Sequence, residues 1–379
     1  MKITLKTKPL LTLVQALIKV IPARSAQPIL ENFLVSATSG GVSITASDLE
    51  TTMTAILPKG GDEPASVEEE GTIAIPARFL LDIIKQVEDD TVTLTANDSS
   101  ASIAWKTGRS SIPVFDPDDF PATSGEITDA KTFEIPEQEL LDALNATLYA
   151  VGEDEIRPVM CGIFFDATPN GLCLVSSDSH RLAIRTIPSV TVPEAASFVL
   201  HKRNATLLKG LLGGEGDVKV SFNQDAATFL ADGITLRART VVGKYPRWRD
   251  VMPKGYQNVL TADPKALASV VKRVSVCASK VSNLIKIVLG TDALGGSMEI
   301  SAQDLGYSTS AVEKTPADYQ GENLTIGFKA PFMLELLGSF SCDNIKISFL
   351  NGKRAVLVEP EQLPEGSYTS CVLMPVATS

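Results

Sequence analysis

The sequence repeats one pattern of elements three times, and this repeat constrains the fold more than any other feature of the chain. Each copy holds a hairpin-like pair of strands with glycine at its turn, followed by an aspartate. The three aspartates, Asp48, Asp178 and Asp304, are separated by 130 and 126 residues, which sets the register of the repeat. The 379 residues are therefore expected to fold as three copies of one domain.

Two helices are expected in each copy, because apolar residues recur there at helical spacing. The first is expected near residues 10–21, 140–151 and 267–274, and the second near residues 79–87, 207–212 and 332–340. Proline stands at the start of each first helix, where the N–H groups have no partner inside the helix.

Short strands fill the rest of each copy. The hairpins are expected at residues 32–36 with 42–46, 162–166 with 172–176, and 285–289 with 298–302. Neighbouring strands joined by tight turns form antiparallel sheets. We therefore predict an α+β fold with three repeated domains, 1–130, 131–257 and 258–379, each consisting of two helices packed on antiparallel sheets.

The formal net charge of −11 is not spread evenly. Residues 1–24 and 264–291 each contain five basic residues and no acidic one, and both segments hold the first helix of a copy. Such a face is either simply solvated or an electrostatic surface for phosphate groups. Recurrence at equivalent places favours the second interpretation, although the first helix of the middle copy is acidic. Further basic residues stand at the second helices: Arg78, Lys85, Lys202, Arg203, Lys209 and Lys329.

Cysteine and histidine usage argues against several kinds of site. Five cysteines without a close pair fit neither a disulfide framework nor a zinc module, and two histidines do not make a multi-histidine metal site. We expect a cytoplasmic protein without a metal or cofactor. No apolar run approaches the roughly 18 residues of a membrane span, so no membrane contact is expected.

The stretch Ser177-Asp178-Ser179-His180 contains the residue types of a hydrolase. Its residues are sequence neighbours, however, and no nucleophile elbow surrounds the serine. Asp178 also has repeat partners in Asp48 and Asp304 that lack a nearby histidine, which indicates an aspartate that forms a turn. No nucleotide-binding or metalloprotease motif appears elsewhere.

Two further segments allow two interpretations each. The segment Lys244–Pro253 combines aromatic, proline and basic residues, and it is either a base-stacking surface or, as we favour, an interdomain connector with anchored aromatics. The apolar tail Tyr368–Val376 either completes a sheet edge or lets Met374 and Pro375 line a groove for a partner peptide.

Together these features resemble the bacterial β sliding clamp family, the processivity subunits of DNA polymerase III, over essentially the whole chain. The matching segments are Arg24 before Gln27–Leu30, Asp48–Glu50, Arg157-Pro158 before Gly162, Ser177–Leu182, Tyr245-Pro246 through Met252-Pro253, and Met374-Pro375. The resemblance implies a non-enzymatic homodimer joined head to tail. Its six domains would form a ring with the helices inside, facing duplex DNA without reading its sequence.

Site residues follow from the same resemblance. It implies that DNA is contacted by Arg24, Arg78, Lys202 and Arg203, with Arg157 in the adjacent loop. It also implies a groove that binds short motifs of the polymerase catalytic subunit, the clamp loader and other clamp-binding proteins. The groove positions are Met160, Ser177, His180, Arg181, Leu182, Pro246, Val251, Leu373, Met374, Pro375 and Val376.

Ring closure should join the first domain of one subunit to the third domain of the other. Candidate segments are the edge strand Ser110–Val114 and the helix end Val274–Lys280, with Ile112, Val114, Val276 and Cys277 at the dimer interface.

The sequence departs from the family pattern at three places. Ser179 replaces a common glycine, Asp250 stands where some members have a basic residue, and three residues follow Val376. Two alternatives to the clamp stay open at this point: a hydrolase centred on Ser177, Asp178 and His180, and a repeat scaffold with no DNA role.

Overall fold

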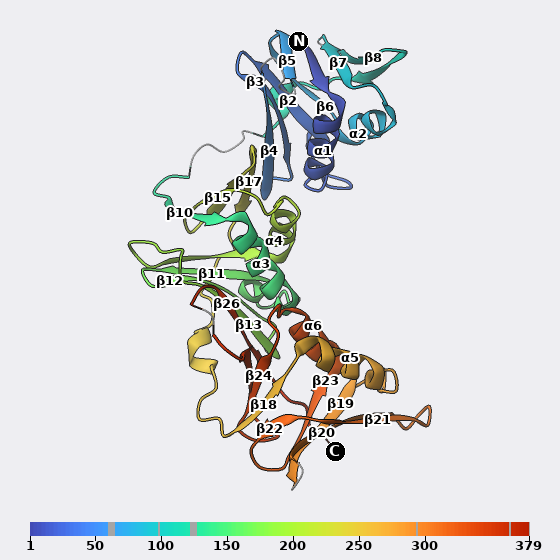
Figure 1. The fold of residues 1–379 in the computed structure, drawn as a ribbon. Coiled ribbons are helices and arrows are strands. Elements are labelled where there is room, and N and C mark those ends of the chain that lie inside the picture. Colours follow the sequence, from blue (N-terminus) through green and yellow to red (C-terminus); the bar gives the residue numbers. More distant parts are fainter. Residues whose placement is uncertain (60–64, 98, 122–126, 293–294, 364, 379) are drawn as a thin grey trace. The chain divides into compact units, whose positions relative to one another are not determined.

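A computed structural model describes residues 1–59, 65–97, 99–121, 127–292, 295–363 and 365–378 (Figure 1). The first copy of the repeat contains β1 (Lys2–Lys6), α1 (Thr7–Leu17), β2 (Asn32–Thr38), β3 (Gly41–Ser47), β4 (Thr51–Pro58), β5 (Ala65–Glu69), β6 (Gly71–Pro76), α2 (Ala77–Gln86), β7 (Thr91–Ala96), β8 (Ser100–Trp105) and β9 (Gly108–Pro113).

The second and third copies follow the same order of elements, except that the second has no counterpart of β5. The second contains β10 (Lys131–Pro136), α3 (Glu137–Thr147), β11 (Gly162–Thr168), β12 (Gly171–Ser177), β13 (Arg181–Ile187), β14 (Ala196–His201), α4 (Lys202–Lys209), β15 (Asp217–Phe222), β16 (Ala226–Ala231) and β17 (Ile234–Arg239). The third contains β18 (Asn258–Ala262), α5 (Pro264–Ser275), β19 (Leu284–Asp292), β20 (Gly295–Asp304), β21 (Thr309–Pro316), β22 (Asp318–Gln320), β23 (Leu324–Lys329), α6 (Ala330–Gly338), β24 (Ile345–Phe349), β25 (Val356–Pro360) and β26 (Tyr368–Leu373).

The predicted threefold α+β repeat is confirmed, with two helices in each copy. The expected hairpins are β2–β3, β11–β12 and β19–β20, all antiparallel. Gly41 and Gly171 begin the returning strands with φ of +137° and +133°, a conformation that side chains rarely allow. A Cβ atom on Gly41 would also lie 2.4 Å from the carbonyl oxygen of Leu57, so a glycine is required there.

The first helices of the first two copies are shorter than the apolar spacing predicts, whereas α5 covers its predicted range. α1 ends at Leu17 and α3 at Thr147, yet the apolar residues beyond them, Ile21 and Val151, are still buried. The apolar period continues into the following turns because these turns pack on the same core. Only the helical hydrogen bonding stops early.

Two sheets extend across the boundaries between copies, and this connection positions the candidate site. The eight-stranded sheet has the order β10-β15-β16-β17-β4-β3-β2-β6, so the last strand of the second copy pairs with β4 of the first. The nine-stranded sheet has the order β14-β11-β12-β13-β26-β25-β24-β18-β22, so β13 of the second copy pairs with β26 of the third. The remaining sheets are β5-β1-β7-β8-β9 and β21-β20-β19-β23.

The chain divides into two compact units that follow these sheets. One unit comprises residues 1–138 and 206–240, and the other comprises residues 139–205 and 241–379. The middle copy contributes to both units, because its two sheets continue into different neighbours.

The helices bury one face and expose their basic residues. In the first unit α1 packs against α2, and in the second α5 packs against α6. The core-facing residues of α5 are Leu267, Val270, Val271 and Val274, together with Pro264 at its start. The basic residues Lys8, Lys19, Lys265, Lys272 and Arg273 are exposed, so they lie away from the core.

Candidate functional site

Each of the three repeat aspartates forms a turn. Asp178 Oδ1 accepts hydrogen bonds from the backbone N–H groups of His180 and Arg181, both at 2.8 Å. Asp48 and Asp304 hold the equivalent turns through backbone N–H groups two and three residues further on. This arrangement confirms the predicted turn-forming aspartates.

The geometry does not assemble a hydrolytic triad from the same stretch. The Ser177 hydroxyl donates to the Arg181 carbonyl oxygen at 2.7 Å rather than to His180. The His180 ring instead lies 6.0 Å from the ring of Phe332, centroid to centroid. The serine proton and the aspartate oxygen both serve the turn, so this stretch lacks an activated nucleophile.

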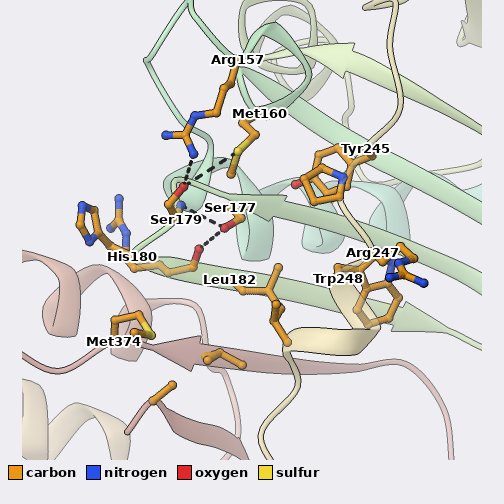
Figure 2. Close-up of a pocket in the computed structure, with 15 residues that line it drawn as sticks. Arg157, Met160, Ser177, Ser179, His180, Leu182, Tyr245, Arg247, Trp248 and Met374 are labelled. Atoms are coloured by element: carbon orange, nitrogen blue, oxygen red, sulfur yellow. Dashed lines mark hydrogen bonds between the residues drawn. The ribbon is translucent and has the colours of Figure 1, made fainter. Parts of the chain in front are cut away.

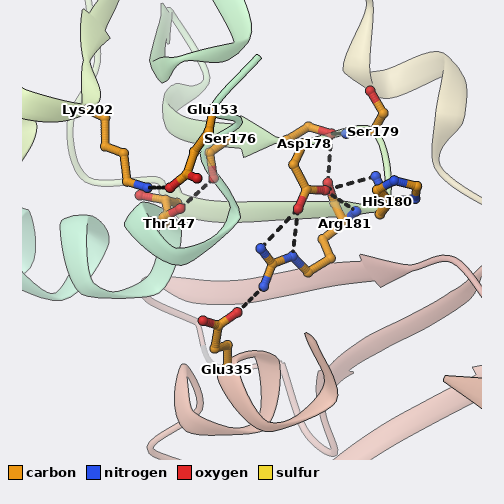
Figure 3. Close-up of polar contacts among 10 residues, drawn as sticks. Thr147, Glu153, Ser176, Asp178, Ser179, His180, Arg181, Lys202 and Glu335 are labelled. Carbon is orange, nitrogen blue, oxygen red and sulfur yellow. Dashed lines mark hydrogen bonds and ion pairs between the residues drawn. The ribbon is translucent and has the colours of Figure 1, made fainter. Parts of the chain in front are cut away.

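Arg181 connects this turn to the third copy of the repeat. Its side chain is 8% exposed and pairs with Asp178 at 2.9 Å and with Glu335 of α6, as Figure 3 shows. The guanidinium also lies over the rings of Phe332 and Tyr149, with its carbon 4.1 Å and 5.4 Å from their centroids. Two acids and two aromatic faces therefore hold one buried cation at the place where β13 meets β26.

A cavity of about 390 Å³ opens beside this turn (Figure 2). That volume falls within the usual range for sites that bind small molecules or short peptide segments. The residues that line it come from the loop before β11, the turn around Ser179, the connector after β17, the strands β13 and β26, and the ends of β25 and β26. They are Arg157, Met160, Ser177, Ser179, His180, Arg181, Leu182, Tyr245, Pro246, Arg247, Trp248, Val251, Ala355, Val372 and Met374.

The floor of the cavity is a small apolar cluster separate from the main core of the third copy. Leu182, Tyr245 and Val372 belong to this cluster, and Trp248 packs against it. The ring of Tyr245 stacks on that of Phe164 with centroids 4.6 Å apart. Burial raises the pKa of the Tyr245 phenol, so the ring stays neutral. The connector is thus anchored by its aromatics, and the same aromatics make the cavity apolar.

A hydrogen bond at the rim joins two loops. The Arg157 guanidinium donates to the Ser179 hydroxyl at 2.7 Å (Figure 2). It also pairs with Asp154 at 3.3 Å. Ser179 has φ of +76°, and Leu49 at the equivalent turn of the first copy has φ of +75°. The serine occupies a conformation that favours glycine, and its hydroxyl makes a contact that glycine lacks.

The structure brings eight of the eleven sequence-predicted groove residues to this cavity; Leu373, Pro375 and Val376 do not line it. Leu373 is 0% exposed within the main core of the third copy, because alternate residues of a strand point to opposite faces. Val376 instead bonds to Gly327 of β23.

Sequence reasoning missed several cavity residues. Strand alternation could have identified Val372, since a residue two positions from Met374 shares its face. Tyr245 and Trp248 were noted only as connector anchors. Arg157, which the resemblance assigned to DNA, lies at the cavity rim. Arg247 belongs to the segment Lys244–Pro253, which we favoured as a connector, and Ala355 has no motif around it in the sequence.

The other residues assigned to DNA lie at the helices or in the loop after α1. Arg24, Arg78 and Arg203 are exposed, and Arg78 stands in the first turn of α2. Lys202 begins α4 and pairs with Glu153 at 2.8 Å, as Figure 3 shows. The hydrogen bond and charge of Lys202 lower the pKa of the Glu153 carboxyl.

The residues assigned to the dimer interface differ in exposure. Val276 follows α5 and is 77% exposed, whereas Cys277 and Val114 are half-buried. Ile112 of β9 is only 5% exposed, so its side chain packs inside its own domain. Only the backbone of β9 at this position remains for pairing with another chain.

In the part of the chain that the structure describes, no three or more His, Cys, Asp or Glu residues are grouped to hold a metal ion. Likewise, none of the described helices is long and apolar enough to cross a membrane.

The chain is thus a threefold α+β repeat joined by continuous sheets, with an apolar cavity at one junction. Models of the DNA polymerase III beta subunit match the chain in three parts: the N-terminal domain at residues 1–124, the central domain at 134–247 and the C-terminal domain at 249–377. The chain therefore belongs to the DNA polymerase III beta subunit family.

Named relatives and solved structures agree with this assignment. The chain is 26% identical to the beta sliding clamp of Synechococcus elongatus over 368 residues, covering 95% of this chain and 96% of that protein. It is 26% identical to the beta sliding clamp of Staphylococcus aureus over 384 residues, covering all of both. The crystal structure of the DNA polymerase sliding clamp from Bacillus subtilis superposes with a TM-score of 0.92 at 26% identity, covering all of both chains. Family membership makes this chain an accessory subunit of a DNA polymerase, not an enzyme.

Proposed function

We propose that two copies of this chain close head to tail into a ring that encircles duplex DNA. The ring tethers the replicative polymerase to DNA, and the clamp loader and other partners bind the same apolar cavity. The observation that carries this proposal is the continuity of the sheets across the copies, together with the two strands left at sheet edges.

The pattern of junctions predicts how the ring closes. The strand that follows the hairpin in one copy, β4 or β13, pairs with the last strand of the next copy, β17 or β26. In the third copy the strand after the hairpin is β21, and in the first copy the last strand is β9. Both are edge strands within the described sheets. Pairing β21 of one chain with β9 of a second repeats the internal junction and covers both edges. Two such junctions close a ring.

The exposed basic residues supply the inner surface of this ring. Lysines and arginines on the solvent side of the helices attract phosphates but carry no sequence information. Arg24, Arg78, Lys202 and Arg203 are proposed to face DNA, with Arg157 nearby at the cavity rim. An overall charge of −11 weakens binding elsewhere on the surface, so the contacts are loose enough for sliding.

The cavity is proposed to bind a short apolar peptide segment of the partners. Its floor is aromatic and aliphatic, and the Arg181 charge is balanced by Asp178 and Glu335. An apolar side chain can enter such a site without leaving a buried charge unpaired. We place the protein in the bacterial cytoplasm, where its DNA and protein partners are found. The free cysteines agree with this reducing compartment.

We place the domain boundaries at 130/131 and 257/258.

Encirclement is tested by DNA topology. The chain is loaded by its own clamp loader on a nicked circular plasmid, and the bound fraction is measured by gel filtration before and after one restriction cut. A ring stays on the circle and slides off the linear ends. Equal retention on both forms would refute the proposal, because an ordinary DNA-binding surface does not respond to ends.

A further inference from the structure

The strand that precedes the second helix is covered at the same position in every copy of the repeat. These strands, β6, β14 and β23, each stand at the edge of their sheet. The fourth residue of each strand bonds to the segment that follows the last strand of the same copy. The Phe115 N–H donates to Ala74 O at 2.8 Å, the Val241 N–H to Val199 O at 2.9 Å, and the Val376 N–H to Gly327 O at 2.8 Å.

The third copy differs because its edge residue is a glycine. A Cβ atom on Gly327 would lie 2.9 Å from the carbonyl oxygen of Val376 and 2.6 Å from Cγ2 of Thr378. It would also lie 2.9 Å from Cδ1 of Leu284, which is the end of a side chain and can turn aside. Real Cβ atoms essentially never approach backbone oxygen so closely, and a backbone atom cannot turn aside as a side-chain end can. The tail is therefore placed so that the Val376 carbonyl and Thr378 occupy the space of a Cβ atom at residue 327.

The same tail forms part of the cavity wall. Met374 lines the cavity, and its N–H donates to the His180 carbonyl oxygen at 2.9 Å. Two residues further on, Val376 is fixed on Gly327. The segment from Met374 to Val376 is thus held at both ends, by the turn after β12 and by the edge of β23.

We infer that Gly327 is a positioning residue for partner binding: it lets the tail dock on β23 and so fixes Met374 in the cavity wall. This inference rests on the proposed peptide-binding role of the cavity. Gly327 does not line the cavity itself, and the only backbone atom among its close Cβ contacts is the Val376 carbonyl oxygen of the tail. A docked tail presents a preformed wall, whereas a released tail must be ordered by the peptide at the expense of affinity.

The test uses Gly327→Ala in the full chain, with Gly338→Ala as the matched control. A Cβ atom on Gly338, at the end of α6, meets nothing within 4 Å. In Gly327→Ala we expect faster deuterium uptake in the peptide covering residues 374–378. We also expect about tenfold weaker binding of a fluorescent peptide copied from the C-terminus of the polymerase catalytic subunit. Gly338→Ala should change neither. If the tail exchanges faster while the peptide binds as before, the inference is overturned.

A shortened chain distinguishes an effect of Gly327→Ala on the tail from an effect on the sheet that contains β23. A chain ending at Pro375 lacks Val376, so it should bind the peptide about tenfold more weakly whether residue 327 is glycine or alanine. An equal further loss from Gly327→Ala in the shortened chain would show that the substitution acts through the sheet and would overturn the inference. If the unmodified chain fails to bind the peptide, the cavity's proposed role fails instead. The exchange measurement still reports tail docking in that case.

Discussion

Ser179 shows how one position can depart from a family pattern without losing its fold. Its positive φ disfavours a side chain, yet its hydroxyl accepts a hydrogen bond from Arg157 across the cavity rim. The turn around it is fixed independently by Asp178, which bonds two backbone N–H groups. The strain at Ser179 is therefore tolerated because its neighbours determine the backbone.

Arg181 should matter more for stability than an exposed arginine of the same cavity. Arg181→Ala leaves Asp178, whose side chain is 16% exposed, without its charged partner. We expect a loss of about 2 kcal/mol in the free energy of unfolding. Arg247→Ala is the control, because Arg247 is 81% exposed and its partner Asp250 is exposed as well. Urea denaturation at one fixed chain concentration measures both. Equal losses in the two variants would contradict the assigned role.

Cys371 should be the least reactive thiol of the folded chain. Burial raises its pKa to about 11, and its sulfur lies 3.1 Å from the hydroxyl of Tyr149. Since the thiolate is the reactive form, iodoacetamide at pH 8 should leave Cys371 unmodified in the native protein and modify it in urea. Peptide mass spectrometry reads out each site. Rapid native labelling of Cys371 would show that this region opens.

The raised pKa of Cys371 also predicts that the folded state becomes less stable at alkaline pH. The folded state favours the protonated thiol, so its contribution is complete below the ordinary cysteine value of 9.0 and is lost as pH rises toward about 11. Burial also raises the pKa of Tyr149, which acts in the same direction. The Cys371→Ser variant should therefore lose less stability than the native chain over this window.

At the scale of elements, the order of helices and strands was predictable because each copy confirms the others. The apolar spacing located all six helices, and only their ends shifted. The pairing of β17 with β4 and of β13 with β26 was not predictable. The apolar pattern of a strand shows which face is buried, but not which other strand pairs with it. The cavity depends on the second of these junctions. For that reason sequence reasoning found its motif residues but missed Ala355, which lies just before β25 and reaches the cavity only through this sheet.

The helices and their flanking loops should carry the DNA contacts, and a charge-matched control can show it. We expect the combined change of Arg24, Lys202 and Arg203 to Glu to weaken retention on nicked circular DNA and to flatten its salt dependence. The control changes Lys219 and Lys346 on strands, and Lys353 in a turn, to Glu. Both variants have the same net charge, so a general electrostatic effect would weaken them equally. That result would refute the assigned lining.

At the scale of the whole molecule, the internal junctions fix the register of the proposed ring. Thr52 of β4 and Leu182 of β13 are equivalent, because each pairs with the residue just before the repeat aspartate. Across the junctions, Thr52 pairs with Arg237 and Leu182 pairs with Val372. In the third copy the equivalent residue is Ser310 of β21, which pairs with the residue just before Asp304. Arg237 and Val372 each stand four residues before the residue that covers the edge strand, Val241 or Val376. The corresponding residue of the first copy is found by counting four residues back from Phe115.

That residue is Ser111, so Ser310 of one chain should lie opposite Ser111 of the other. Opposite Cβ atoms in an antiparallel pair lie about 4.5–5.5 Å apart, close to disulfide geometry. The double variant Ser111→Cys/Ser310→Cys should therefore form covalent dimers on mild oxidation, seen on a non-reducing gel. Ser110→Cys/Ser310→Cys is the control, since a shift of one residue turns the side chain to the opposite face. Light scattering should report dimers for both variants before oxidation. Monomers, or crosslinking in the control pair alone, would show that β9 and β21 do not form the junction.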